Sequence, residues 1–472
     1  MARNIFHRTM PATVSGALIA LTVFLGYFAD RPAFPTLLGA YSLSFVLYAA
    51  VLSGREQTAA RQGWWIALGL GLRALLLCST PNFSDDVYRF LWDGHLSAAG
   101  IHPFAQPPAY YMEQALAVPG NTPDLYQRLN SPQYHTVYPP VCQAVFWLAV
   151  RCFPGNMAGA IGVIKCFLLA CEAGTIAVLF RLEKSAPGGA AQAAAPFSIA
   201  VAYALNPLAI QEITGNCHLE GAMLCFLLAG LWALHRRRND LAAVFWALAT
   251  AAKLLPLLFL PALVSELGWR RGLRFAAVFG AVAAVLFLPL LRPEMLLHMA
   301  GSLQLYFRQF EFNASLYYIF KTIGEAWAPP KLDVARTLGP ILAGVVSLSV
   351  LLLSAAYKHR GRRGSHGGRG HLPEQMVLAL AIYLSLATTV HPWYVVPLFG
   401  LSLLSPWRFP LCWSAAVVLS YSHYAGGGFQ ENYGLISLEY ALVLLGIGWD
   451  IRQYRRRLSL SNSRPRNTGP GF

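Results

Sequence analysis

Apolar stretches approaching 20 residues recur from one end of this 472-residue chain to the other. About 20 apolar residues cross a bilayer as an α-helix, so a chain with many such stretches does not fold as a water-soluble globule. Only 12% of the residues are charged, about half the share found in a typical soluble domain. In lipid, only helices and closed barrels satisfy their backbone hydrogen bonds. The apolar runs are continuous and not alternating, which favours helices over a barrel.

We therefore predict an all-α polytopic membrane protein, a single integral membrane domain over 1–472 with about 12–14 transmembrane helices. The short segments 240–252 and 254–268 also fit a helical hairpin that does not fully cross. The apolar segment 137–153 is predicted to be re-entrant or interfacial, because a full crossing there would move the later basic loops outside. The candidate spans are 12–29, 33–53, 63–80, 158–180, 196–212, 219–235, 240–252, 254–268, 272–291, 334–357, 374–390, 391–405, 408–424 and 433–450.

The net charge of +15 comes from short basic clusters that lie between the apolar runs. This pattern is the positive-inside signal that sets orientation, so it indicates topology and not a nucleic-acid partner. It predicts cytoplasmic termini in the cytoplasmic (inner) membrane. The first run is longer than the apolar part of a signal peptide, and we expect it to be a retained span. The basic loop 357–373 and the tail 459–472 are rich in Gly, Ser and Arg, which predicts cytoplasmic disorder.

Two long loops, 82–136 and 292–333, are predicted to lie outside, and long loops on a rigid scaffold often carry function. The first contains the acidic sequence Ser84-Asp85-Asp86. Ser84 is predicted to cap a helix whose first turn holds Asp85 and Asp86. The aromatic residues that follow predict a helix lying along the outer membrane surface. The second loop contains Asn313 in an Asn-Ala-Ser sequon, which we expect to be exposed.

Asp86, Arg89 and Asp93 share one face of the predicted helix, because residues three and four apart are neighbours. Trp92 flanks this face. Two adjacent carboxylates at the membrane surface repel each other, which raises a pKa and suits a general base. A divalent cation at Asp85 and Asp86 is an alternative, and a capped surface helix with an Asp–Arg pair is the simplest interpretation.

The sequence SDDVYRFLWDGHLSAAGIHPF at 84–104, followed by HTVYPP at 135–140, resembles the membrane glycosyltransferases of the GT-C class. More narrowly, it is similar to bacterial mannosyltransferase-like families that use a polyprenyl-phosphate sugar. The resemblance covers roughly residues 73–400. It departs from the family where Leu219-Glu220 replaces a frequent Asn-Asp. Further matching patches lie at 206–207, 215–220, 253–258, 312–317 and 391–394.

The resemblance implies a GT-C-like bundle with the catalytic base at Asp85 or Asp86, of which Asp85 is favoured. It implies transfer of a sugar from a polyprenyl-phosphate donor to a lipid or glycan acceptor. The family that it resembles indicates that this sugar is mannose. The transfer would occur at the outer face with inversion. The partners would be donor, acceptor and membrane lipids. No nucleotide is required by this chemistry, and the chain shows no Walker A or GxGxxG nucleotide loop.

Polar residues at membrane depth are costly and often functional, which adds further substrate-binding candidates. Lys253 could bind the donor phosphate, or it could be a snorkelling lysine at a helix end. His218 and Glu220 could position substrate hydroxyls or phosphate, or form a plain interfacial turn. His391 and Tyr394 could bind phosphate and line a lipid groove, or belong to an aromatic belt. The remaining candidates are Arg89, Trp92, Asp93, Tyr138 and Asn313.

Arg73 and Lys165 lie within predicted spans, and either could neutralise a buried carboxylate such as Glu172. A transporter or flippase is the alternative function. It would predict inverted repeats and functional charges in the middle of spans. The sequence shows no obvious inverted repeat, and its acidic cluster lies in an external loop.

Overall fold

The computed structural model describes residues 2–54, 58–185, 197–308, 310–329, 332–363 and 371–462. These residues fold almost entirely into helices; the one extended pairing in the described ranges is a parallel bridge between Phe312 and Thr389. The helices are α1 (Ala2–Tyr27), α2 (Phe34–Ser53), α3 (Ala59–Leu75), α4 (Asp86–Ala98), α5 (Pro108–Glu113), α6 (Pro123–Gln127), α7 (Pro140–Cys152), α8 (Met157–Ser185), α10 (Ile199–Ala204), α11 (Pro207–Ala209), η2 (Ile210–Gly215), α12 (Glu220–His235), α13 (Asn239–Ala252), η3 (Leu255–Phe259), α14 (Leu260–Leu267), α15 (Trp269–Phe287), η4 (Leu288–Leu290), α16 (Pro293–Arg308), α17 (Leu316–Trp327), α18 (Val334–Arg363), α19 (Leu372–Leu386), α20 (Pro392–Ser402), α21 (Phe409–Ala416), η5 (Val417–Gly427) and α22 (Tyr433–Asn462).

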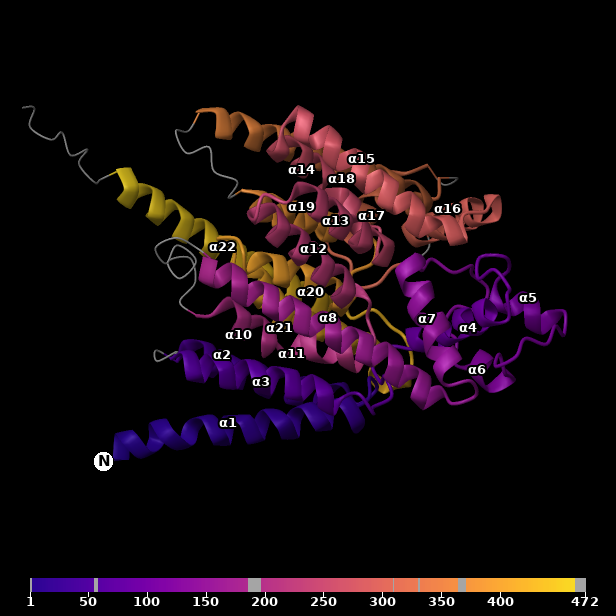
Figure 1. Ribbon diagram of the computed structural model, residues 1–472, viewed down its shortest axis with the longest axis horizontal. Helices are drawn as coiled ribbons and strands as arrows, with labels where there is room; N and C mark the ends of the chain where they lie inside the picture. Colours follow the sequence, from indigo (N-terminus) through magenta and orange to yellow (C-terminus); the bar gives the residue numbers. More distant parts are fainter. Residues whose placement is uncertain are drawn as a thin grey trace, which may run out of the picture.

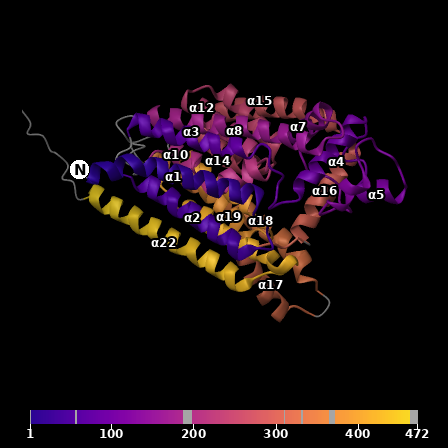
Figure 2. The same ribbon diagram turned by 90° about the horizontal axis from the view of Figure 1, so that it is seen from below.

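The long helices share one general direction, along the longest axis of the molecule (Figure 1). The first external loop, with α4 to α7, gathers at one end of this axis. The start of α1 and the end of α22 lie at the opposite end, and the perpendicular view in Figure 2 shows the same separation. The predicted external loop and the chain ends therefore occupy opposite poles of the bundle.

Five helical segments of the described residues are long and apolar enough to cross a membrane. A sixth candidate is the pair 207–215 and 220–235, which is bent by 114°. The predicted all-α polytopic class is confirmed, and the count of 12–14 crossings stays a prediction. The five are Phe34–Ser53, Met157–Ser185, Trp269–Leu290, Val334–His359 and Tyr433–Arg456.

Several predicted spans are not single continuous α-helices. Segment 196–212 breaks into α10, α11 and η2 because Asn206 caps a new helix that begins with Pro207. Segment 391–405 contains only the 11-residue α20, and 408–424 changes from α21 to the 3-10 helix η5. Apolar composition alone does not reveal such breaks, because the prolines that begin the new helices lie inside apolar runs.

The predicted bounds of the basic loop and the tail fall partly on helices. Helix α18 continues to Arg363, and α19 begins at Leu372. Helix α22 continues to Asn462. The rest of both predicted segments, 364–370 and 463–472, lies outside the described residues, so their predicted disorder stays a prediction.

Helix α4 differs from the sequence prediction at its start and in its surroundings. It begins at Asp86, one residue later than predicted, and Asp85 makes no side-chain cap. Ser84 Oγ accepts a hydrogen bond from the Asp86 N–H at 3.3 Å, in line with the predicted cap. Its aromatic residues face protein and not the membrane surface, since Phe90 stacks on Phe146 of α7 at 4.5 Å. Trp92 is fully buried. The hydrophobic effect thus turns the aromatic face of α4 into the core of the external loop.

Gly94 sits where α4 and α7 approach most closely. A Cβ atom added there would lie 2.5 Å from the backbone oxygen of Phe146, which is too close for a carbon and an oxygen that are not bonded to each other. We expect Gly94→Ala to push the two helices apart and to destabilise the protein by about 1–3 kcal/mol. Thermal unfolding in detergent should show a lower midpoint, whereas Gly63→Ala, with open space at its Cβ, should not. Equal midpoints would contradict this close packing.

A buried ion pair joins three helices in the centre of the bundle. Arg73 Nε of α3 lies 2.9 Å from Glu172 Oε2 of α8, and both side chains are fully buried. The other Glu172 oxygen accepts a hydrogen bond from Tyr203 Oη at 2.8 Å. Lys165 instead donates to the Leu76 carbonyl and to Ser79 Oγ. The prediction that Glu172 is neutralised by a neighbouring cation is confirmed, and Arg73 is that cation.

Candidate functional site

The acidic turn before α4 holds its two carboxylates with different partners. Arg31 Nη2 lies 2.6 Å from Asp85 Oδ2. Asn130 donates to Asp86 Oδ1 at 3.0 Å. Two-fifths of the Asp85 side chain is exposed, and Arg31 contacts only one of its oxygens. Asp85 is therefore a carboxylate that a substrate can reach, held in place by a neighbouring cation.

Asn216 fixes the acidic turn to the middle of the bundle. Its Oδ1 accepts hydrogen bonds from the backbone N–H groups of Asn82 and Phe83, at 3.3 and 3.0 Å. Its Nδ2 donates to the Gln211 carbonyl at 3.0 Å. Asn216 follows the π-helix η2, and a π-helix often marks a functional position. Asn216 of one patch that resembles the GT-C class therefore holds the two residues that directly precede another such patch, 84–104.

Lys253, Glu220 and Tyr138 form a second group, which we call the Lys253 group. Lys253 Nζ lies 2.8 Å from Glu220 Oε1 and 5.8 Å from the centre of the Tyr138 ring. Glu220 begins α12, and Lys253 follows the last residue of α13. Both polar residues therefore stand at helix ends, where the backbone also offers unpaired groups. Lys253 is about one-quarter exposed, and its cation is available to an anionic ligand.

Trp393 is sandwiched between two histidines next to this group. The ring of Trp393 lies 3.6 Å from that of His218 and 4.3 Å from that of His391, and both pairs are stacked. His218 Nε2 lies 3.5 Å from Glu212 Oε2. His391 also contacts Tyr394 edge-on at 5.4 Å. The break between η2 and α12 and the start of α20 thus bring His218 and His391 together.

Phe312 connects the histidine stack to the acidic turn. Its ring lies 4.5 Å from the His391 ring and 6.1 Å from the Tyr424 ring. Arg31 in turn lies over the Tyr424 ring at 4.6 Å while it binds Asp85. A series of contacts therefore runs from Asp85 through Arg31 and the aromatic rings to His218. His218 stands two residues before Glu220 of the Lys253 group. We call the whole set the polar-aromatic cluster; its members are Arg31, Asp85, Tyr138, His218, Glu220, Lys253, Phe312, His391, Trp393, Tyr394 and Tyr424.

Three predicted substrate-binding residues lie inside the external loop instead. Arg89 Nε binds Asp93 Oδ1 at 2.9 Å, and Asp93 also accepts hydrogen bonds from Thr136 and Gln143. Asp93 and Trp92 are fully buried, and Arg89 is 7% exposed. In this structure the three residues hold α4 against the end of the loop, so the arrangement gives them a positioning role.

Asn313 is fully buried, which corrects the expectation of an exposed sequon. It adopts the left-handed conformation with φ 50°, which is uncommon for a residue other than glycine. Its Nδ2 lies 3.1 Å from Glu439 Oε2, and its carbonyl accepts from Tyr440 Oη at 2.7 Å. Asn313 therefore anchors the loop that carries Phe312.

The geometry at Asp85 and Asp86 does not favour a bound divalent cation. Three or more oxygen ligands are usual for such an ion. In the described part of the chain no group of three His, Cys, Asp or Glu side chains is arranged to hold a metal. Arg31 already binds one oxygen of Asp85, Oδ2, and Asn130 binds one oxygen of Asp86, Oδ1. We therefore derive no step through a metal at this turn.

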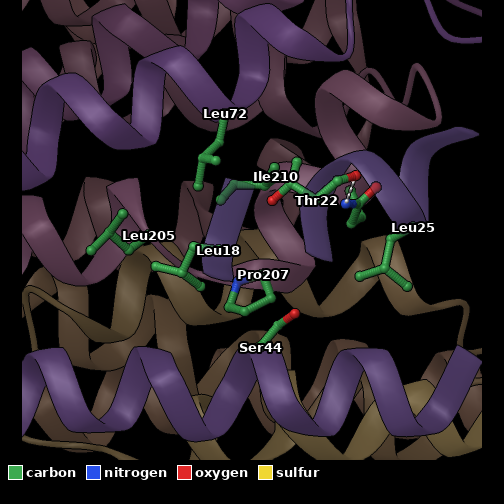
Figure 3. Close-up of a pocket in the computed structure, with 9 residues that line it drawn as sticks. Leu18, Thr22, Leu25, Ser44, Leu72, Leu205, Pro207 and Ile210 are labelled. Carbon is green, nitrogen blue, oxygen red and sulfur yellow. Dashed lines mark hydrogen bonds between the residues drawn. The ribbon is translucent and has the colours of Figure 1, made fainter. Parts of the chain in front are cut away.

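A small pocket lies apart from these residues, between α1, α2, α3 and the broken segment at 205–211 (Figure 3). Gln211 Nε2 donates to the Thr22 carbonyl at its edge, at 3.3 Å. Most of its lining is aliphatic, and it contains none of the predicted site residues. It is lined by Leu18, Thr22, Leu25, Ser44, Leu72, Leu205, Pro207, Ile210 and Gln211.

A family model described as alpha-(1->6)-mannopyranosyltransferase, N-terminal domain, matches residues 15–268, which is more than half of the chain. The chain belongs to this mannosyltransferase family. Membership supports glycosyltransferase activity and, more narrowly, mannosyl transfer. The matched range contains Asp85, Glu220 and Lys253, whereas Phe312 and His391 lie beyond it. No curated protein matches the chain.

Two residues of this region were absent from the sequence prediction: Arg31 of the cluster and Glu212, which lies 3.5 Å from His218. Arg31 lies in the short connection between the first two helices, where a basic residue has no local signal of function. Glu212 was missed because it lies in a segment predicted to be a plain span. It is fully buried and accepts hydrogen bonds from Tyr41 and Tyr421. A carboxylate inside an apolar run was the available signal, since such residues are usually functional.

Proposed function

We propose that the protein transfers mannose from a polyprenyl-phosphate donor to a hydroxyl group of a lipid or glycan acceptor, with inversion, at the outer face of the cytoplasmic membrane. The observation that carries the proposal is the series of contacts from Asp85 to His218, which stands two residues before Glu220, the partner of Lys253. It offers a base and a cation within one cluster. The membrane-capable helices around it would let a lipid-linked donor enter from the bilayer.

The carboxylate of Asp85 is the base in this proposal. As the acceptor oxygen forms a bond to the anomeric carbon, its proton moves to Asp85, and the bond from that carbon to the phosphate oxygen breaks. The electron pair of that bond leaves with the phosphate. General-base catalysis of this kind contributes about 10²- to 10⁴-fold to a rate. Arg31 keeps Asp85 oriented, because it binds Oδ2 alone.

The phosphate gains charge as it leaves, and Lys253 is the more exposed of the two cations of the cluster, Lys253 and Arg31. A fixed cation stabilises developing charge without reorganisation. His218 and His391 add ring N–H groups beside it. The family description names an alpha linkage, and inversion would form it from a β-linked mannosyl phosphate. The proposed donor is therefore a β-linked polyprenyl-phosphate mannose.

Lys253→Gln tests the proposed binding of the donor phosphate by Lys253. Removing the charge should lower kcat/KM for polyprenyl-phosphate mannose by about 10²- to 10³-fold. The measurement is transfer of radiolabelled mannose in proteoliposomes. Lys321→Gln is the matched control, because Lys321 forms a similar Lys–Glu pair with Glu311 outside the cluster. Equal rates for the two variants would remove Lys253 from the donor site. Solute uptake without transfer would favour a transporter.

A further inference from the structure

The polar-aromatic cluster borders a second His–carboxylate pair that the reaction above does not use. His423 Nε2 lies 3.5 Å from Glu431 Oε2. His423 belongs to η5, and Glu431 lies in the connection to α22. The pair lies beyond the range that the family model matches, and the His423 ring contacts Phe312 of the cluster at 5.0 Å.

The pair has hydrogen-bonding atoms with no partner. His423 is 1% exposed, yet neither ring nitrogen makes a hydrogen bond. Glu431 Oε1 accepts from the backbone N–H of Asn313 at 3.3 Å, while its Oε2 faces His423 Nε2 at 3.5 Å without a hydrogen bond of good geometry. The Tyr318 hydroxyl approaches the same carboxylate, and it too lacks a hydrogen bond of good geometry. An unpaired buried polar atom is expensive. Such atoms gathered at one place in an enzyme suggest that a ligand satisfies them.

The surroundings of the pair are aromatic. The Phe312 ring lies 5.0 Å from the His423 ring, and the Phe429 ring lies 6.1 Å from both. Phe429 is 55% exposed. It follows Gly426 and Gly427, which both have positive φ values and present the aromatic ring at the surface. An exposed ring beside unpaired polar atoms offers an apolar face and hydrogen-bonding groups to one ligand.

The position of the pair defines which substrate it would meet. Tyr424 follows His423 directly, and the Tyr424 ring carries Arg31, the partner of Asp85. The Phe312 ring contacts both the His423 ring and the His391 ring. Through Tyr424 and Arg31 the pair therefore lies beside the proposed base, where the acceptor hydroxyl must lose its proton.

We propose that His423 and Glu431 bind hydroxyl groups of the acceptor sugar, with Phe429 against the face of the sugar ring. A hydroxyl group is both donor and acceptor, so it can donate to Glu431 Oε2 and accept from a His423 ring N–H. The acceptor class is accordingly a hydroxyl-rich glycan or glycolipid head group. This acceptor site rests on the proposed transfer reaction, and it deepens that proposal by separating the two substrates.

The test compares acceptor and donor kinetics in His423→Phe and Glu431→Gln. His423→Phe keeps a ring against Phe312 and removes both nitrogens, and Glu431→Gln keeps the Oε1 acceptor. The donor is polyprenyl-phosphate mannose, and the acceptor probe is octyl α-mannopyranoside. Loss of a hydrogen bond to a charged group should raise the acceptor KM by about 10- to 100-fold. The donor KM should stay within twofold.

His371→Phe and Glu374→Gln are matched controls, because this His–Glu pair has the same 3.5 Å separation outside the cluster. Unchanged acceptor KM in both cluster variants, or an equal rise in donor KM, overturns the acceptor site. Thermal unfolding in detergent checks that the variants fold. If the wild type transfers no mannose, the proposed reaction is wrong. The acceptor site is then tested separately, by calorimetric measurement of octyl α-mannopyranoside binding. Weaker binding by both variants than by the wild type supports the acceptor site. Equal binding by the variants and the wild type, or no binding by the wild type, overturns it.

Discussion

Asp85→Asn is expected to lower the rate of mannosyl transfer by about 10²- to 10⁴-fold, the usual contribution of a general base. Asparagine keeps the size of the side chain and can still accept a hydrogen bond from Arg31. It cannot take a proton from the acceptor hydroxyl. The loss should therefore appear in kcat, with little change in the KM for either substrate. Steady-state transfer in proteoliposomes measures both constants.

Asp86→Asn should have a smaller effect than Asp85→Asn, because Asp86 is bound by Asn130 and not by a cation of the cluster. Asp124→Asn is the control in the same external loop, since Asp124 forms an exposed pair with Arg128 and should leave transfer unchanged. If Asp86→Asn abolishes transfer while Asp85→Asn retains full activity, the base is Asp86 and the assignment made here is wrong.

Arg73→Ala is expected to destabilise the folded protein by about 3–5 kcal/mol, because it leaves the Glu172 carboxylate buried without its cation. The guanidinium also donates to the carbonyl groups of Gly69 and Ala204, at 2.9 and 2.6 Å. These acceptors would lose a partner as well. Thermal unfolding in detergent should show a large fall in the midpoint and poor recovery of folded protein.

Two comparisons distinguish destabilisation by the unpaired buried charge of Glu172 from destabilisation by lost packing. Arg73→Ala combined with Glu172→Gln should recover part of the stability, because no carboxylate then remains unpaired. Arg128→Ala removes an exposed Arg–Asp pair, and exposed pairs contribute little. A midpoint for Arg73→Ala that matches that of Arg128→Ala would show that the buried pair does not stabilise the bundle.

The sequence predicted the class of fold because length and apolarity are sufficient for it. Transmembrane-length apolar runs need no knowledge of tertiary packing to be recognised. The breaks at Asn206 and before Pro392 could not be placed this way, since apolar residues surround them. The predicted position of α4 along the membrane surface was also wrong, because an aromatic helix face suits a membrane surface and a protein core equally well.

The candidate site was predicted as separate patches and not as one arrangement. His218, Glu220, Lys253 and His391 were identified because polar residues in apolar surroundings are unusual. Their contacts depend on helix breaks about 30 to 170 residues apart, and nothing in a single sequence gives such pairings. Phe312 begins one of the patches, but its contacts with His391 and Tyr424 could not be predicted from the sequence. Arg31 connects that patch to Asp85, yet an arginine in a short turn is too common to stand out.

The donor class is the claim that one measurement tests most directly. Purified protein in liposomes would be given an acceptor such as octyl α-mannopyranoside, with either radiolabelled polyprenyl-phosphate mannose or radiolabelled GDP-mannose as the donor. We predict labelled product from the lipid-linked donor alone, and none from that donor with Asp85→Asn. Product formed from GDP-mannose without any polyprenyl phosphate would contradict the account.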